Sequence, residues 1–162
     1  MAQIHVMPRG FPNDDLYPKP MRSERPMHIS LRTGVVPTKV TTVRRVPLRY
    51  EAEASKTIKD LFKRGVITPV KETTEWCSPA FFVPKGDNIR GFLVTDYTEL
   101  NKHVNRPVHL FQHTKEILQA ISPEAKFFCK LDAVHGYFQL GMDEYSSKLT
   151  TFLLSQGKFH YL

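Results

Sequence analysis

The chain has 162 residues, of which 41% are hydrophobic and 24% are charged, a balance typical of a soluble globular domain. No apolar run approaches the roughly 18 residues of a membrane span, and the first ten residues lack the apolar core of a signal peptide. We therefore expect no membrane partner and a cytoplasmic or nuclear location. Cys77 and Cys129 have no zinc-type spacing, which favours buried free thiols over a metal site.

The positive charge is concentrated in the first part of the chain. The net charge is +7, and residues 1–49 hold nine Lys or Arg against three Asp or Glu, together with seven of the twelve prolines. Residues 50–162 are nearly balanced, with fourteen Lys or Arg and thirteen Asp or Glu. The pattern indicates a basic, Pro-rich leader or linker over residues 1–49, extended rather than packed, followed by a folded domain over residues 50–162. A solvated linker is favoured over a dedicated binding tail.

The first regular element predicted is an amphipathic helix over residues 50–64. Its apolar positions recur at helical spacing on one stripe, namely Tyr50, Ala54, Ile58, Leu61 and Phe62. Acidic residues occupy the first turn and basic residues the last, and Gly65 supplies a stop signal, all as the helix dipole prefers.

Short strands are predicted to follow this helix. Val66–Val70 and Ala80–Val83 are apolar and β-rich, with Ser78-Pro79 between them, and a turn-prone stretch follows at residues 84–88. Phe92–Thr95 is predicted as a further strand.

The second half of the chain predicts one more helix and three strands. Thr114 is placed to cap a helix through Ile121, which Ser122-Pro123 ends. Phe127–Leu131 reads as a strand that leads into Asp132. Thr150–Leu154 and Lys158–Leu162 flank Ser155-Gln156-Gly157 and indicate a hairpin. We expect its last strand to lack a partner and the chain to be cut off within a longer fold.

Several segments, in this order, resemble the reverse transcriptase of Gypsy-class LTR retrotransposons. They are Arg64 to Val70, Trp76 to Lys85, residues 94–102, Arg106 to His109, residues 125–139, and Leu149 to Phe152. The third segment contains the block Asp-Tyr-x-x-Leu-Asn at 96–101, and the fifth contains the block Leu-Asp-x-x-x-Gly-Tyr-x-Gln at 131–139. The likeness covers roughly residues 27–162.

The resemblance implies an α+β fold, made of the fingers and the first part of the palm of a right-hand polymerase. Short strands and helices would be mixed, and the palm sheet would be incomplete. It also implies RNA-directed DNA synthesis within a Pol polyprotein. The partners would be an RNA or DNA template-primer, deoxynucleotides, and the rest of the polyprotein with its palm, thumb and RNase H.

Asp132 matches the family's first metal-binding aspartate. Nucleotidyl transfer uses two Mg²⁺ ions about 4 Å apart, and carboxylates must hold them. By the resemblance, Asp132 would be both a catalytic residue and a Mg²⁺ ligand in the complete enzyme. Alone, it would read as a solvated aspartate at the end of a strand.

The residues near Asp132 and in the predicted fingers turn match the family's nucleotide-binding positions. Tyr137 matches the aromatic residue on which the deoxyribose packs. Backbone N–H groups near His135 and Gly136 would meet the triphosphate, and Lys85 would reach the γ-phosphate. The structural alternatives are core packing for Tyr137 or Phe138 and a solvated turn position for Lys85.

Two departures from the family pattern predict that the chain is inactive alone, with weak or absent Mg²⁺ binding. The family's triphosphate-clamping arginine is replaced by Phe92, and the 162 residues contain no Tyr-x-Asp-Asp turn. Asp143 and Glu144 are expected to be solvated and not to substitute. A domesticated remnant that binds nucleic acid or protein without catalysis is the alternative, and a nonfunctional relic is a third.

Other polar residues are weaker candidates. His109 and His113 have the spacing of a helical metal pair, but they lie in a Pro-preceded loop without a third ligand nearby, so we do not expect a metal there. Asp96 has two open roles, orienting the backbone or helping to bind a nucleotide.

Overall fold

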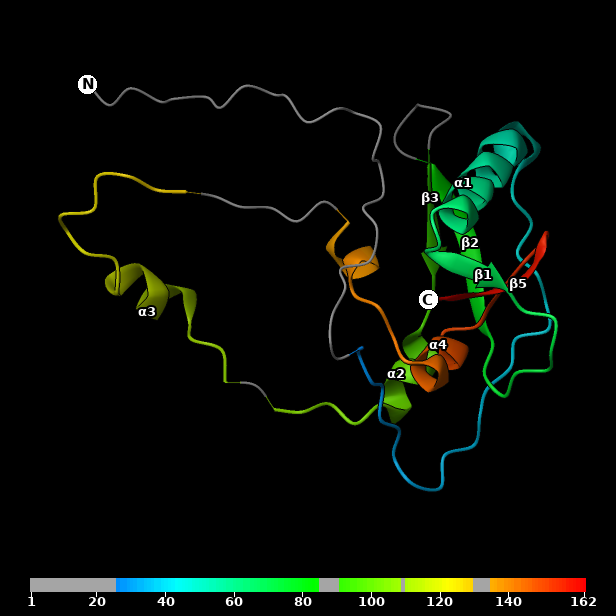
Figure 1. Cartoon of the computed structure of the whole chain (residues 1–162), viewed down its shortest axis with the longest axis horizontal. Coiled ribbons are helices and arrows are strands. Elements are labelled where there is room, and N and C mark those ends of the chain that lie inside the picture. The colour runs from blue at the N-terminus through cyan, green and yellow to red at the C-terminus, as the bar shows by residue number, and fades with distance from the viewer. Residues whose placement is uncertain (1–25, 85–90, 109, 130–134) are drawn as a thin grey trace.

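The chain folds around a mixed five-stranded sheet. The computed structural model describes residues 26–84, 91–108, 110–129 and 135–162 (Figure 1). In the order β1-β5-β4-β2-β3, all neighbouring strands are antiparallel except the parallel pair β2–β4. The strands are β1 Ile67–Pro69, β2 Ser78–Pro84, β3 Gly91–Thr95, β4 Phe152–Leu154 and β5 Gly157–Tyr161.

The helices and strands are grouped along the chain, with η1 and α1 before β1 and the other described helices between β3 and β4. The predicted α+β fold of mixed short elements is confirmed. The described helices are η1 Leu48–Tyr50, α1 Glu51–Lys63, α2 Thr98–His103, α3 Thr114–Gln119, η2 Gly136–Gln139 and α4 Glu144–Leu149. None of the helices in the described ranges has the length and apolar character that crossing a bilayer requires.

Helix α1 packs on the sheet with the stripe that the sequence predicts. Ala54, Ile58 and Leu61 are buried, whereas Phe62 is 53% exposed, so its assignment to the buried stripe was wrong. Phe62 follows Leu61 by one residue, which turns its side chain about 100° further around the helix. Gly65 ends the helix at φ 69°, and Val66 N donates to Leu61 O at 2.9 Å, as in a glycine-terminated helix.

The core lies between α1 and the strands. Phe152, which has no exposed surface, stacks on Phe159 of the same hairpin with ring centres 6.0 Å apart. The buried members of this cluster are Ile58, Leu61, Val66, Ile67, Ala80, Phe152, Leu154 and Phe159. Residues from both ends of the domain therefore meet in one core.

The predicted hairpin of β4 and β5 forms, but its place in the sheet corrects the sequence-based expectation. Strand β5 pairs with β1 on one side and with β4 on the other, so the last strand is not an unpaired edge. Ser78 and Pro79, expected to separate two strands, instead begin β2 and pair in parallel with Phe152 and Leu153.

Residues 105–108 and 110–129 extend away from the sheet (Figure 1). Thr114 was predicted to cap helix α3, but it is the first residue of the helix, and the N-cap is the preceding residue, His113. The described part of the predicted strand 127–131 is not a strand, because no described strand lies beside it to pair with. Phe127 is 94% exposed, and Cys129 is exposed rather than buried. Cys77 is buried, and both thiols are free.

Residues 26–47 run alongside the domain and bond to it. Isolated β-bridges join Met27 to Met142, Leu31 to Val104 and Lys39 to Cys77. Val46 is buried in a second small cluster with Tyr50, Ala54 and Phe82. We call residues 26–31 the strap.

We expect Phe152→Ala to lower the free energy of unfolding by about 3–5 kcal/mol, because it leaves a cavity among fully buried neighbours. Urea denaturation measures this change. The matched control Phe127→Ala, at an exposed position, should change it by less than about 0.5 kcal/mol. Equal effects of the two substitutions would show that the β4–β5 hairpin is not the centre of the core.

Candidate functional site

The structure describes three of the five residues assigned to the site from sequence. His135, Gly136 and Tyr137 lie at the start of η2. Asp132 and Lys85 lie outside the described residues, as does His109. The described part of the site is therefore the turn that presents Tyr137.

This turn begins with an unusual backbone conformation at His135. Its φ of 48° and ψ of 47° are left-handed, and it is the one non-glycine residue with positive φ in the described ranges. Non-glycine residues adopt this region at an energetic cost, though His is among those that tolerate it better. Phe138 N donates to His135 O at 2.8 Å, and the two rings stack at 5.7 Å, which stabilises the turn.

The two neighbouring aromatic residues of η2 point to different environments. Phe138 stacks on Tyr161 of β5, with ring centres 5.9 Å apart, and packs against the main core cluster. Tyr137 is 91% exposed. Of the two residues for which the sequence left core packing as the alternative, Phe138 packs against the core and Tyr137 does not.

Tyr137 lies at the rim of an apolar cleft with a volume of about 470 Å³. Its lining residues come from the strap, α2, η2 and three strand ends: Met27, Ile29, Val66, Thr95, Tyr97, Asn101, Tyr137, Phe138, Leu140, Met142, Thr150, Tyr161 and Leu162. A cleft of this size with a few polar groups matches the general character of ligand sites in proteins.

Hydrogen bonds hold the polar groups of the cleft. Tyr97 Oη donates to Thr150 O at 2.8 Å, and the hydroxyls of Thr95 and Tyr161 are 3.3 Å apart. Burial raises the pKa of Tyr97 well above its ordinary value. Tyr97 therefore remains a neutral donor at physiological pH. Its hydrogen bond connects the segment just after β3 to Thr150 at the end of α4.

Asp96 supports the backbone next to the cleft. Its carboxylate accepts hydrogen bonds from Thr98 N at 3.0 Å and from Thr98 Oγ1 at 2.5 Å. These bonds, chiefly that of the Thr98 hydroxyl, lower the pKa of Asp96. Of the two roles that the sequence left open, this contact favours orienting the backbone at the start of α2.

Asp143 is bonded at the start of α4 and not simply solvated, which corrects the sequence-based expectation. Its Oδ1 accepts from Ser146 N at 2.7 Å, and its Oδ2 lies 2.5 Å from His28 Nδ1. Hydrogen bonds from Ser146, followed by that from His28, lower the pKa of Asp143 to about 2. The missed signal was an N-cap aspartate, with Ser146 at the third position of the helix. Glu144 is exposed, and its carboxylate pairs with Lys148 at 2.9 Å.

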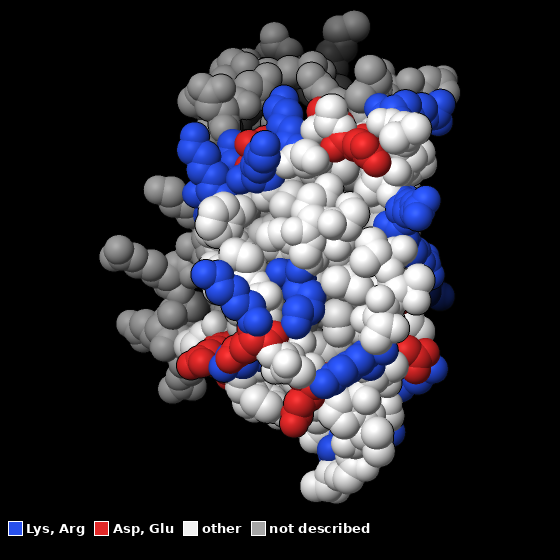
Figure 2. All heavy atoms as spheres, turned by 90° about the vertical axis from the view of Figure 1, so that its right-hand side faces the viewer, with Lys and Arg blue, Asp and Glu red and all other residues white. Residues whose placement is uncertain are grey.

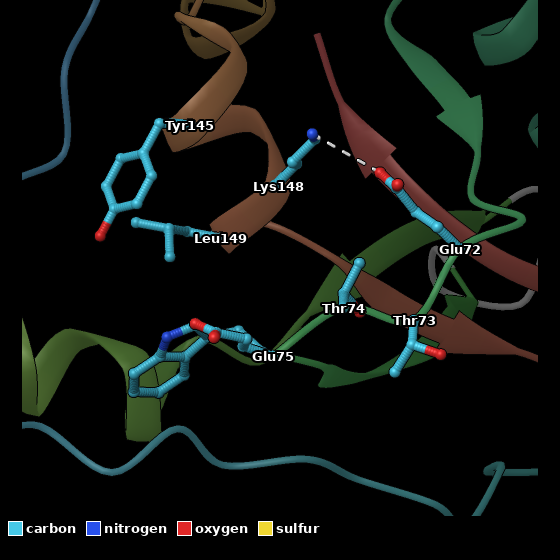
Figure 3. A pocket seen from close by; sticks show the side chains of 8 residues that line it. Glu72, Thr73, Thr74, Glu75, Tyr145, Lys148 and Leu149 are labelled. Atoms are coloured by element: carbon cyan, nitrogen blue, oxygen red, sulfur yellow. Dashed lines mark ion pairs between the residues drawn. The ribbon is translucent and has the colours of Figure 1, made fainter.

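A smaller pocket of about 210 Å³ lies elsewhere and shares no lining residue with the cleft. Figure 3 shows Lys148 and Glu72 facing each other across it, at 3.6 Å, with Tyr145 and Leu149 at the opposite end. No motif in the sequence predicts a site here. The ion pair is exposed, so it stabilises the fold little.

The described residues offer no site that fits a divalent cation. No three of their His, Cys, Asp or Glu side chains are grouped to hold a metal. Asp132, the ligand expected from sequence, lies outside the described ranges. His113 is the N-cap of α3, and its backbone N–H donates to Glu116 Oε2 at 3.1 Å.

One face of the domain carries scattered basic side chains. Figure 2 shows Lys and Arg spread over the face that lies on the right in Figure 1, among fewer acidic groups and without a continuous stripe. Just before α1, Arg44 lies over the ring of Phe81 at 5.0 Å and Arg49 over that of Tyr50 at 4.5 Å. These contacts hold the guanidinium groups at the surface next to β2 and α1.

Comparison with curated proteins identifies relatives among polyproteins. No family model matches the chain. The enzymatic polyprotein of Figwort mosaic virus (strain DxS) is 30% identical over 149 residues, which are 88% of this chain and 22% of that polyprotein. The retrovirus-related Pol polyprotein from transposon 412 of Drosophila melanogaster is 28% identical over 122 residues, 72% of this chain and 10% of the polyprotein. The chain's homologues are Pol polyproteins of viruses and retroelements.

The solved structures agree with this result. Prototype foamy virus protease-reverse transcriptase covers 92% of the chain with a TM-score of 0.68 and 26% identity, over 20% of its own length. A foamy viral protease-reverse transcriptase solved with double-stranded DNA covers 87% with a TM-score of 0.64 and 22% identity, a likeness of fold alone. The predicted reverse-transcriptase-like α+β fold is therefore confirmed. The chain spans about a fifth of the length of the first relative and of the first structure.

We expect Asp143 to stabilise the fold in a defined pH range. Its pKa is about 2 in the folded chain against an ordinary 3.8, so the contribution is complete above pH 3.8 and is lost as the pH falls through about 2. Melting temperatures of the chain and of Asp143→Asn between pH 6 and pH 2 measure it. The difference between them should shrink as the pH falls. A difference that is constant down to pH 2 would contradict the assigned hydrogen bonds.

Proposed function

We propose that this chain is the fingers and the first part of the palm of a Gypsy-class LTR retrotransposon reverse transcriptase. In the complete Pol protein it would serve RNA-directed DNA synthesis. The observation that carries the proposal is the likeness to prototype foamy virus protease-reverse transcriptase over 92% of the chain. The Gypsy class is proposed from sequence, because the blocks around Asp96 and Asp132 match the Gypsy pattern and follow one another in the same order.

The geometry of η2 supports a nucleotide-binding role for Tyr137. A platform for a deoxyribose must be exposed on one side and firmly seated on the other. Tyr137 is exposed, and the adjacent Phe138 is anchored on Tyr161 in the core. The left-handed turn at His135 directs the backbone into η2, and successive N–H groups in such a turn form a concave site suited to phosphate oxygens.

Asp132 and Lys85 enter the proposal from sequence alone. Asp132 would be the catalytic carboxylate and a Mg²⁺ ligand of the complete enzyme, and Lys85 would contact the γ-phosphate as a point charge. Residues 1–162 contain no Tyr-x-Asp-Asp pair. On their own they would therefore bind Mg²⁺ weakly, if at all, and extend no primer.

The proposed partners are a template-primer, deoxynucleotides and the remaining Pol domains. A foamy viral relative has been solved with double-stranded DNA. In this chain, the exposed arginines before α1 are suitable for contacts with phosphates, which make affinity depend on salt but not on sequence. A non-catalytic remnant that binds nucleic acid would keep these contacts and lose the chemistry, so catalysis is what separates the two hypotheses.

Primer extension by a chimera tests the proposed function. Residues 27–162 would replace the matching segment of an active foamy viral reverse transcriptase, and extension would be measured with Mg²⁺ on a primed template. We expect activity in the chimera and none above background in its Asp132→Asn variant, because one of the metal-binding carboxylates is then lost.

The matched control for the chimera is Asp60→Asn on α1, far in sequence from the site, which should leave extension unchanged. Residues 1–162 alone should be inactive. A folded chimera without activity would favour the non-catalytic alternative. Extension that persists in Asp132→Asn would contradict the role given to Asp132.

Binding of a primed template to residues 1–162, measured by fluorescence anisotropy over a range of salt concentrations, tests the nucleic-acid surface. We expect Arg44→Gln/Arg45→Gln to reduce the slope of log affinity against log salt by about two, since each phosphate contact contributes roughly one. Gln keeps most of the stem that packs at Phe81. The control Lys148→Gln removes a charge already paired with Glu72 and Glu144, and its slope should not change. Equal slopes in both variants would place the contact surface elsewhere.

A further inference from the structure

The strap forms one wall of the cleft although it lies more than 100 residues from η2 in sequence. Met27 and Ile29 line the cleft beside Tyr137 and Phe138. In Figure 1 the strap is the blue segment that passes beside α2 and α4. Near its other end, Asn105 N, just after α2, donates to Ser30 O at 2.8 Å, and Arg32 N, the residue after the strap, donates to O of His103, the last residue of α2, at 2.9 Å.

The strap also bonds to the segment that leaves η2. Met27 N donates to Gly141 O at 2.9 Å, and Asp143 N donates to Met27 O at 3.2 Å. Residues 141–143 follow Leu140, the C-cap of η2. The strap therefore fixes the exit of the turn that carries Tyr137, while the stacking of Phe138 on Tyr161 fixes its middle.

Asp143 joins the strap to α4. One carboxylate oxygen caps the helix through Ser146 N, and the other bonds His28 Nδ1 at 2.5 Å. His28 also stacks on Tyr145 at 5.8 Å, and Ser146 Oγ accepts from Ile29 N at 2.7 Å. Bonds to a charged carboxylate are stronger than those between neutral groups. Without the Asp143 carboxylate, the hydrogen bonds between the strap and residues 141–146 would be the two backbone bonds of Met27 and the bond from Ile29 N to Ser146 Oγ.

We propose that Asp143 is a positioning residue for the nucleotide site: through His28 it holds the strap against residues 141–143 and thereby sets η2 and Tyr137. The consequence for nucleotides rests on the function proposed above. The positioning of η2 itself depends only on the contacts of the strap with Asp143 and residues 141–143. It makes the strap part of the site rather than part of a linker.

Amide hydrogen exchange of residues 1–162, followed by mass spectrometry, tests this inference. In His28→Ala, exchange of residues 136–143 should rise by about tenfold, as for the loss of one charge-assisted hydrogen bond. Residues 152–161 should keep the protection they have in the unaltered chain. Ser30→Ala is the matched control, because this exposed strap residue bonds Asn105 through its backbone O only, and its exchange should not change.

His28→Asn distinguishes the hydrogen bond from the bulk of the ring. The amide nitrogen of Asn occupies the position of Nδ1 along the side chain, so it can donate to Asp143, and protection of residues 136–143 should return. Exchange as fast as in His28→Ala would overturn the proposal. So would an unchanged rate in His28→Ala, or an equal rise in residues 152–161, which would indicate general destabilisation.

Binding of a deoxynucleoside triphosphate, measured calorimetrically with Mg²⁺ on a chimera that carries residues 27–162, tests the proposed function separately. We expect His28→Ala to weaken it and His28→Asn to restore it. A folded chimera that binds no nucleotide would contradict the proposed function, whereas the exchange experiment on residues 1–162 would still decide the role of Asp143. Nucleotide affinity that is unchanged in His28→Ala, despite faster exchange, would overturn the link to Tyr137.

Discussion

Insertion of the β4–β5 hairpin between β1 and β2 is the constraint on which the rest of the structure depends. Strands β1 and β2 are neighbours in sequence but not in the sheet, since β5 pairs with β1 and β4 with β2. Phe152 and Phe159 of the hairpin complete the core under α1. The first and last parts of the domain therefore have to fold together, and contacts of such long sequence separation are costly in chain entropy.

The same hairpin places the candidate site. Tyr161, near the end of β5, stacks on Phe138 and thereby seats η2 beside the sheet. Tyr161 also meets the hydroxyl of Thr95 on β3, and Tyr97 just after β3 donates to Thr150 just before β4. Part of the cleft wall thus continues from strand ends that the core already fixes, and the strap, α2, η2 and the residues that follow η2 complete it.

Local signals in the sequence predicted the elements that local interactions determine. The apolar stripe and Gly65 gave α1, and the turn at Ser155-Gln156-Gly157 gave the hairpin. The order of the strands could not be predicted, because it depends on pairings between distant segments and a short strand fits several partners. Helices α2 and α4 were not predicted. At α4, the N-cap residue Asp143 was interpreted, together with Glu144, as solvated.

For the proposed nucleotide site, the sequence pattern singled out the turn but not the residues that contact and support it. The block around Tyr137 singled out His135, Gly136 and Tyr137, and all three lie in or next to η2. The supports are His28, Asp143 and Tyr161, which have no motif in common and meet only through the fold. The strap lies within residues 1–49, which were interpreted as a linker because basic residues and prolines dominate their composition. The backbone hydrogen bonds that hold the strap leave no trace in the sequence.

The contrast between Tyr137 and Phe138 shows why such supports are needed. In its proposed role as a ligand platform, the exposed ring of Tyr137 would bury apolar surface only when a ligand binds, so it contributes little to folding on its own. Its position must be fixed by neighbours that do gain from folding. Phe138 does so through the core, and the strap does so through hydrogen bonds at the exit of the turn. The short 3-10 helix η2, with Phe138 anchored and Tyr137 exposed, fixes the position of Tyr137 with few residues. The left-handed backbone at His135 is the conformational strain that this arrangement requires.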